Sequence, residues 1–285
     1  MKHTILFAIT LAVVLNSCKE VGPDINLGKN NNSVSDTTYV ETPVASPETK
    51  HVLIEEFTGV RCPNCPQGHQ IITGLKNTYP EKVVSVSLHP INSLGAPYAF
   101  SVQDFRSTKA QTLFDYLGQI GLEPAAGIDR TKFPGESNIL LDKNSWATNV
   151  AGRLSVATPV NLSIEKELDS LTNELTIIAE VHYTQTITEA NKLTLLITES
   201  EIISAQLDGA TIDTFYNHKD VMRDYITDLK GDLLNGTTEA GRVYRKVYRK
   251  VLDAMWRPEN CHIVGFVHEF QNADKVYQVK EIPVK

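Results

Sequence analysis

Two cysteines three residues apart are the residues best placed to do chemistry. Cys62 and Cys65 follow the strand-like run 52–57 and open a stretch with helical spacing. At the start of a helix, free N–H groups and partial positive charge stabilise a thiolate on the first cysteine, and Arg61 adds positive charge there. The second cysteine, one turn further on, can resolve a mixed disulfide. The spacing therefore predicts thiol–disulfide exchange, with a purely structural disulfide as the alternative.

A histidine four residues after the second cysteine raises the question of a metal. Cys62, Cys65 and His69 have the form C-x2-C-x3-H, which could be part of a zinc site. A structural zinc ion needs four ligands, and no convincing fourth ligand follows in the sequence. We therefore expect neither a metal nor another cofactor.

Other reactive side chains have ordinary interpretations. His89 ends a strand-like run and could tune the dithiol or simply end the strand. Cys261 begins an apolar run, as a small core residue would. The cluster His218, Asp220 and Arg223 could bind a partner, but an isolated charged turn is the commoner interpretation. None of these residues identifies a second reaction.

Composition limits the class of protein. The chain has 285 residues, of which 41% are hydrophobic and 21% charged, which is typical of globular proteins and allows two domains. It has 27 Lys and Arg residues against 34 Asp and Glu residues, a net charge of −7, and no long basic block. A nucleic-acid partner is therefore not expected.

The N-terminus has the pattern of an export signal. The apolar stretch 5–15 is too short to span a bilayer comfortably. The tetrad Leu15-Asn16-Ser17-Cys18 resembles a bacterial lipobox, although Asn16 departs from the usual small residue. We predict a signal peptide over 1–17 and lipid attachment at Cys18, with ordinary cleavage and a free thiol as the alternative. Two or more acyl chains would hold the protein on the outer membrane.

The remaining elements divide the chain into a tether and two folded regions. Residues 18–49 are rich in Asn, Ser, Thr and Pro and predict a flexible tether. A strand, a helix and a second strand then predict a β-α-β unit with parallel strands. The expected elements of this first region are strands at 52–57, 83–88 and 126–130, and helices after Cys65 and near 104–117 and 144–154.

After residue 158 the pattern changes to short strands without intervening helices, which indicates an antiparallel sandwich. The repeat in 243–250 could be a helix, but Val and Tyr favour a strand. The polar segment 208–236 is interpreted as an insertion packed on the sandwich. The expected strands are 160–167, 174–183, 192–203, 242–252, 262–270 and 275–284.

The first region resembles the thioredoxin fold. The resemblance rests on Phe57, the Cys62–Cys65 pair, the β-α-β order, and Glu123-Pro124 ahead of a strand. In that fold a cis-proline loop faces the dithiol and helps to dock an extended peptide, and Pro124 matches it by order and spacing. The usual Trp before the first cysteine is replaced by Arg61, so substrate preference does not carry over.

The whole mature chain is similar to the outer-membrane-protein-28-related lipoproteins of Gram-negative bacteria, known chiefly as envelope lipoproteins and surface antigens. Family membership supplies no reaction. The segments that carry this resemblance are Glu55–Gly59, the cysteine pair, Gly68-His69, His218–Arg223 and Trp256–Asn260.

Together, these observations predict an α/β thioredoxin-like domain over 50–157 followed by an all-β, immunoglobulin-like sandwich domain over 158–285. The predicted function is thiol–disulfide exchange with extended segments of envelope proteins, from the periplasmic or surface face of the outer membrane. Cys62 would attack, Cys65 would resolve, and Pro124 would position the client strand. The alternative is an envelope binding or adhesion lipoprotein whose cysteine pair is only structural.

Overall fold

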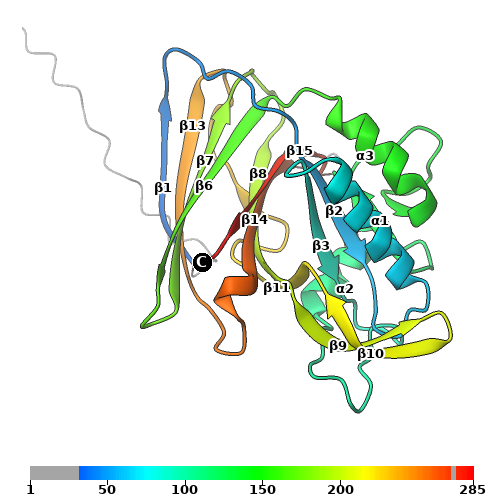
Figure 1. Ribbon diagram of the computed structural model, residues 1–285. Helices are drawn as coiled ribbons and strands as arrows, with labels where there is room; N and C mark the ends of the chain where they lie inside the picture. The colour runs from blue at the N-terminus through cyan, green and yellow to red at the C-terminus, as the bar shows by residue number, and fades with distance from the viewer. Residues whose placement is uncertain (1–31, 271–273) are drawn as a thin grey trace, which may run out of the picture.

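The computed structural model describes residues 32–270 and 274–285, and its regular structure is mainly β-strands, which form three sheets (Figure 1). The predicted signal peptide 1–17 and the lipid-attachment residue Cys18 lie outside the described residues. Within the described ranges, no helix is long and apolar enough to cross a membrane.

The largest sheet contains both parallel and antiparallel strands. The β2–β3 and β3–β11 pairs are parallel, and the other pairs are antiparallel. The predicted β-α-β unit is confirmed, because α1 (Cys65–Thr78) connects β2 to β3. In spatial order the strands are β15 (Val276–Pro283), β14 (Cys261–Glu269), β8 (Asn191–Glu199), β11 (Val221–Tyr225), β3 (Val83–Leu88), β2 (Val52–Phe57), β4 (Ala125–Ile128) and β5 (Leu140–Asp142), with β12 (Asp232–Leu233) paired to β8.

Helices cover both faces of the β2–β3 region. Side chains alternate between the faces of a strand, so Ile54 and Phe57 of β2 point to opposite sides. Ile54 packs with α1 and with α3 (Trp146–Leu154). Phe57 packs with α2 (Thr108–Leu117), where its ring centroid lies 4.7 Å from that of Phe114. All residues of β2 and β3 are buried, which explains the continuous apolar runs of these two strands. Two short 3-10 helices, η1 (Lys143–Ser145) and η2 (Pro258–Asn260), complete the helical elements of the described chain.

A second, antiparallel sheet packs against the C-terminal strands of the large sheet. It has the order β1 (Ser33–Val40), β13 (Arg242–Val251), β7 (Glu174–Tyr183) and β6 (Val160–Asp169). One apolar core joins β7 residues such as Ile177 to Leu195 of β8 and Ile263 of β14. The expected antiparallel strands are therefore present, and the segment 243–250 is a strand rather than a helix.

The predicted flexible tether over 18–49 is wrong for residues 33–40. These residues form β1, which pairs with β13 along the edge of the second sheet (Figure 1). Thr38 donates a side-chain hydrogen bond to the carbonyl of Val243 at 2.8 Å. Polar residues form this strand because β13 supplies the backbone partners that the segment lacks alone.

The interpretation of 208–236 as an insertion on the sandwich is also wrong. Its first part completes a hairpin of β9 (Ile202–Asp208) and β10 (Thr211–His218), and β11 then lies inside the large sheet between β8 and β3. The sheet therefore contains strands from both sides of the predicted boundary at 157/158, and that domain division stays a prediction.

Candidate functional site

The two cysteines form a disulfide at the start of α1. Cys65 is the first residue of the helix, and Cys62 lies in the preceding turn, where its N–H donates to the carbonyl of Gly59 at 3.0 Å. Neither cysteine is exposed to solvent, each having a relative accessibility of 0%. The predicted placement at a helix start is therefore found, but the pair is covered.

One cover is the segment 90–98, here named the strap. The N–H of Arg61 donates to the carbonyl of Leu94 at 2.7 Å. The guanidinium of Arg61 donates to the carbonyls of Ala96 and Pro97, both at 2.7 Å, and lies 4.3 Å from the ring centroid of Tyr98. Arg61 thus holds the strap with its charged group, a role different from the thiolate stabilisation expected of it.

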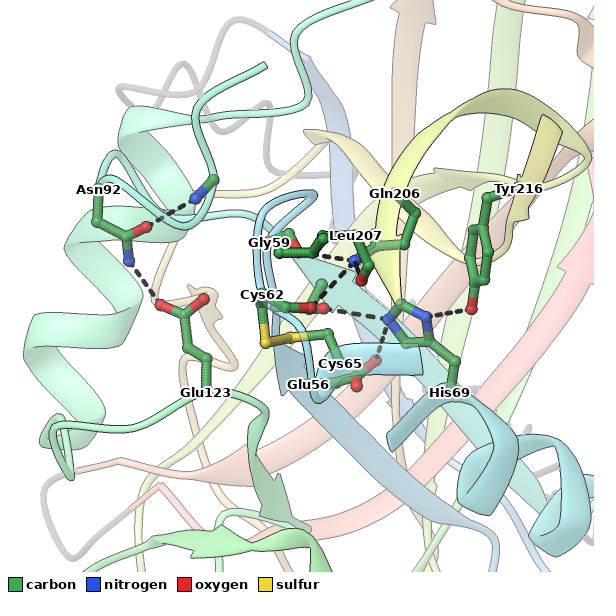
Figure 2. The surroundings of a disulfide bond; sticks show 12 residues. Glu56, Gly59, Cys62, Cys65, His69, Asn92, Glu123, Gln206, Leu207 and Tyr216 are labelled. Carbon is green, nitrogen blue, oxygen red and sulfur yellow. Dashed lines mark hydrogen bonds and ion pairs between the residues drawn. A yellow bond between two sulfur atoms is a disulfide. The ribbon is translucent and has the colours of Figure 1, made fainter. Parts of the chain in front are cut away.

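The strap is also fixed at the loop that contains the predicted cis proline. Asn92 Nδ2 donates to Glu123 Oε1 at 2.5 Å, and Asn92 Oδ1 accepts from the N–H of Gly95 at 2.8 Å (Figure 2). A Cβ atom on Gly59 would lie 2.4 Å from the carbonyl oxygen of Leu94, so only glycine permits this close approach. The strap therefore lies between the disulfide turn and the Glu123 loop.

The second cover is the β9–β10 hairpin. Gln206 Nε2 donates to the carbonyls of Gly59 and Cys62 at 3.1 and 3.2 Å (Figure 2), and the N–H of Gly209 donates to the carbonyl of Pro63 at 2.9 Å. These contacts join residues that are about 145 positions apart in the sequence. Sequence reasoning missed them because no local pattern connects a distant hairpin to the motif.

Pro124 lies at the same end of α1 as the disulfide. The Glu123–Pro124 peptide bond is cis, as the resemblance implied. A Cβ atom on Gly68 would lie 3.0 Å from Pro124 Cγ and 2.7 Å from Glu56 Oε1. Gly68 is three residues after Cys65, on the same side of the helix. The cis proline and the Glu56 carboxyl group therefore meet at the first turn of α1.

Glu56 is a functional candidate that the sequence analysis did not name. It is completely buried, and neither carboxyl oxygen makes a well-formed hydrogen bond within the described part of the chain. Burial raises the pKa of Glu56 well above its usual value, the charges of Asp220 and Glu123 add to this rise, and the Ser87 hydroxyl opposes it. The sequence signal was an acidic residue inside an otherwise buried strand, where charge is costly unless paired.

His69 connects Glu56 to the hairpin. Its Nε2 lies 3.5 Å from Glu56 Oε2 and 3.1 Å from Thr58 Oγ1, and its Nδ1 lies 2.7 Å from the hydroxyl of Tyr216 (Figure 2). Burial lowers the pKa of His69 to about 3, so the imidazole is neutral near pH 7. No group of three or more His, Cys, Asp or Glu residues is arranged to hold a metal ion in residues 32–270 and 274–285.

The other sequence candidates lie apart from the disulfide turn. Cys261 is a buried free thiol in the core between the two sheets, and burial raises its pKa to about 12, so its interpretation as a core residue is confirmed. The predicted cluster is divided: His218 and Asp220 line a cavity beside α1 together with His89, whereas Arg223 pairs with Glu199 at 2.8 Å.

The fold and the site thus define a mostly β-sheet protein with a covered Cys-x-x-Cys disulfide at the start of a helix. A sequence model of the family "Outer membrane protein Omp28" matches residues 110–285, and the chain belongs to that family. It is accordingly an envelope protein. The matched range does not include Cys62 and Cys65, so the family match carries no information about the disulfide.

Two solved structures resemble the chain. HBP35 of Porphyromonas gingivalis aligns with a TM-score of 0.64 and 21% identity, over 84% of this chain and 76% of that one. A protein from Agrobacterium tumefaciens aligns with a TM-score of 0.50 and 11% identity, over 84% of this chain and 97% of that one. At these identities the likeness is one of fold alone. No curated protein matches the sequence.

Proposed function

We propose that this envelope protein exchanges disulfides with extended segments of other envelope proteins through Cys62 and Cys65, within a thioredoxin-like region over 50–157. The observation that carries the proposal is the disulfide at the first turn of α1, next to a fully buried carboxyl group and a cis proline. The β-rich region 158–285 would form a sandwich domain that docks a partner.

The exchange is a balanced two-electron reaction. In the reduced protein, the Cys62 thiolate attacks a client disulfide, whose sulfur–sulfur bond breaks, and the released client sulfur takes up a proton. Cys65 then transfers its proton to the Glu56 carboxylate and attacks Cys62 Sγ. The mixed disulfide breaks, the Cys62–Cys65 bond forms, and the client is left reduced. The reverse sequence oxidises a client dithiol, so one site serves both directions.

A structural disulfide is the second candidate, and the burial of both cysteines favours it. A client cannot reach Cys62 while the strap and the hairpin are in place. Exchange therefore requires displacement of the strap or of the hairpin, and this requirement separates the two candidates experimentally.

Trapping of mixed disulfides tests the proposal. A Cys65→Ser variant should accumulate mixed disulfides with envelope proteins, because the resolving thiol is absent, and Cys62→Ser should trap far fewer. The measurement is a non-reducing gel followed by identification of the captured proteins. Both variants should also be made with Arg61→Ala, which frees the strap. If Cys65→Ser captures nothing even in that background and both variants only lose stability, the disulfide is structural.

We also propose that a lipid on Cys18 anchors the protein to the outer membrane. The support is the short apolar stretch that ends in the lipobox-like tetrad. Cells fed a labelled fatty acid should label the wild-type protein, and Cys18→Ser should abolish the label. Label that persists in Cys18→Ser would place the modification elsewhere and refute this anchor.

A further inference from the structure

A cavity of about 530 Å³ lies between α1, β3 and the turn that joins β10 to β11. Its inner wall includes Glu56, His69 and His89, and Tyr216 and His218 form the hairpin side. Lys76 and Asp220 lie at the other end and are paired at 2.6 Å. A water molecule takes up about 30 Å³ in the liquid, so this volume has room for a chain of waters.

Several buried polar atoms of the lining have no hydrogen-bond partner within the described chain. Those on the three most buried side chains are both carboxyl oxygens of Glu56, both ring nitrogens of His89, and Nε2 of His218. All three side chains are at most 2% exposed. Buried polar atoms are normally satisfied by protein or by ordered water, so these atoms are suited to bind water in the cavity.

His69 lies beside the buried acid in the wall of this cavity. Its side chain is 19% exposed, whereas that of Glu56 is fully buried. One ring nitrogen faces Glu56 and Thr58, and the other contacts Tyr216, as the dashed contacts in Figure 2 show. A neutral imidazole can take a proton at one nitrogen while it releases one at the other. His69 therefore has the geometry of a relay between Glu56 and the cavity.

The disulfide needs such a route because it has no direct contact with solvent. When Cys65 gains or loses a proton, the proton has to cross a region where both cysteines are completely buried. We propose that the cavity beside α1 is the proton route of the Cys62–Cys65 site, with His69 as the positioning residue that passes protons between Glu56 and cavity water. This inference rests on the proposed exchange function.

The groups that set the pH dependence of this route come from several elements. The Glu56 carboxyl group is influenced by Asp220 from the turn between β10 and β11 and by Glu123 from the cis-proline loop, and His69 lies 3.5 Å away. His69 is itself influenced by His218 of β10. At low pH the acceptors are protonated, and at high pH hydroxide in solution can take the thiol proton directly. The relay should therefore matter most near neutral pH.

The test uses the reduced full-length protein in an Arg61→Ala background, so that opening of the strap does not limit the rate. Cys62 is converted to a mixed disulfide with a small aromatic thiol, and release of that thiol by Cys65 is followed between pH 5 and pH 9. His69→Gln should slow release on the order of 10-fold or more near pH 7 and much less at pH 9. His69→Ala should be slow as well, and imidazole added to the buffer should restore part of its rate through the open cavity.

Two controls separate a relay from a structural role. His69→Gln keeps a side chain able to hydrogen-bond Thr58 and Tyr216. If thiol release in His69→Gln is as fast as with His69 present, His69 acts only in packing. His182→Gln removes a partly exposed histidine that pairs with Glu41, far from the cavity, and should leave the rate unchanged. Equal slowing at every pH without imidazole rescue would overturn the relay. Because the small thiol is not a client, this result is independent of whether client trapping succeeds.

Discussion

An Arg130→Met variant should lose about 3–5 kcal/mol of unfolding free energy, because it leaves the Glu55 charge buried without a partner. Arg130 and Glu55 are 0% and 1% exposed, and the guanidinium makes two parallel contacts of 2.7 Å with the carboxylate. The guanidinium also lies 4.9 Å from the ring centroid of Phe266. Urea unfolding of the full chain measures the loss.

Two further variants test the physical reason. In the double variant Glu55→Leu with Arg130→Met, no buried charge remains, so much of the lost stability should return. Arg249→Met removes an exposed arginine that lies 3.7 Å from Glu174, and it should change the free energy of unfolding by less than about 1 kcal/mol. A double variant as unstable as Arg130→Met alone would mean that packing, not the uncompensated charge, explains the cost.

The Glu55–Arg130 pair also shows how the large sheet is held together. Glu55 belongs to β2, Arg130 follows β4, and Phe266 belongs to β14. One buried arginine thus connects the N-terminal strands with a strand from the far side of the predicted boundary. The β-α-β pattern could not reveal this contact, because the three residues are far apart in the sequence.

Elements with a strong local pattern could be predicted from the sequence. The continuous apolar runs of β2 and β3 have the form of strands buried on both faces, and the strict alternation of β7 has the form of a half-buried strand. The strands β1 and β11 were missed for a different reason. β1 is rich in polar residues, and β11 is short and contains two adjacent charges. These charges are paired only after folding, as Asp36 is with Lys246 and Asp224 with Lys109.

The candidate site, like the fold, could be predicted from the sequence only in part. Cys62 and Cys65 were predictable from their spacing, and Pro124 from its order along the chain. The covers were not, because Gln206 and the strap reach the disulfide turn through tertiary contacts. Glu56 could have been noticed, because two adjacent acidic residues in one buried strand both need partners. Of the two, only Glu55 is paired with a buried cationic side chain.

The second large effect concerns the strap. Arg61→Ala should speed up reduction of the Cys62–Cys65 disulfide by an external thiol about 10- to 100-fold. The variant loses two side-chain hydrogen bonds from a charged group to strap carbonyls. Hydrogen bonds to charged groups contribute about 1.5–3 kcal/mol each, and about 1.4 kcal/mol corresponds to a factor of ten in population. At the lower end of that range, loss of one bond gives about 10-fold and loss of both gives about 100-fold. The protein is incubated with dithiothreitol as the reductant. At fixed times the released protein thiols are alkylated, and the alkylated fraction gives the rate.

Asn92→Ala should have an effect of the same sign, because it removes the contact of the strap with Glu123 and a hydrogen bond to Gly95 within the strap. Arg249→Ala is the matched control, since this exposed arginine lies on β13 and does not contact the strap. The free energy of unfolding of each variant should fall by no more than the strap contacts that the variant loses, because the strap contributes little to the apolar cores. If the disulfide of Arg61→Ala and of Asn92→Ala is reduced as slowly as that of the wild type, the strap is not what protects Cys62. The β9–β10 hairpin, held by Gln206 on the carbonyls of Gly59 and Cys62, would then be the cover that a client has to displace.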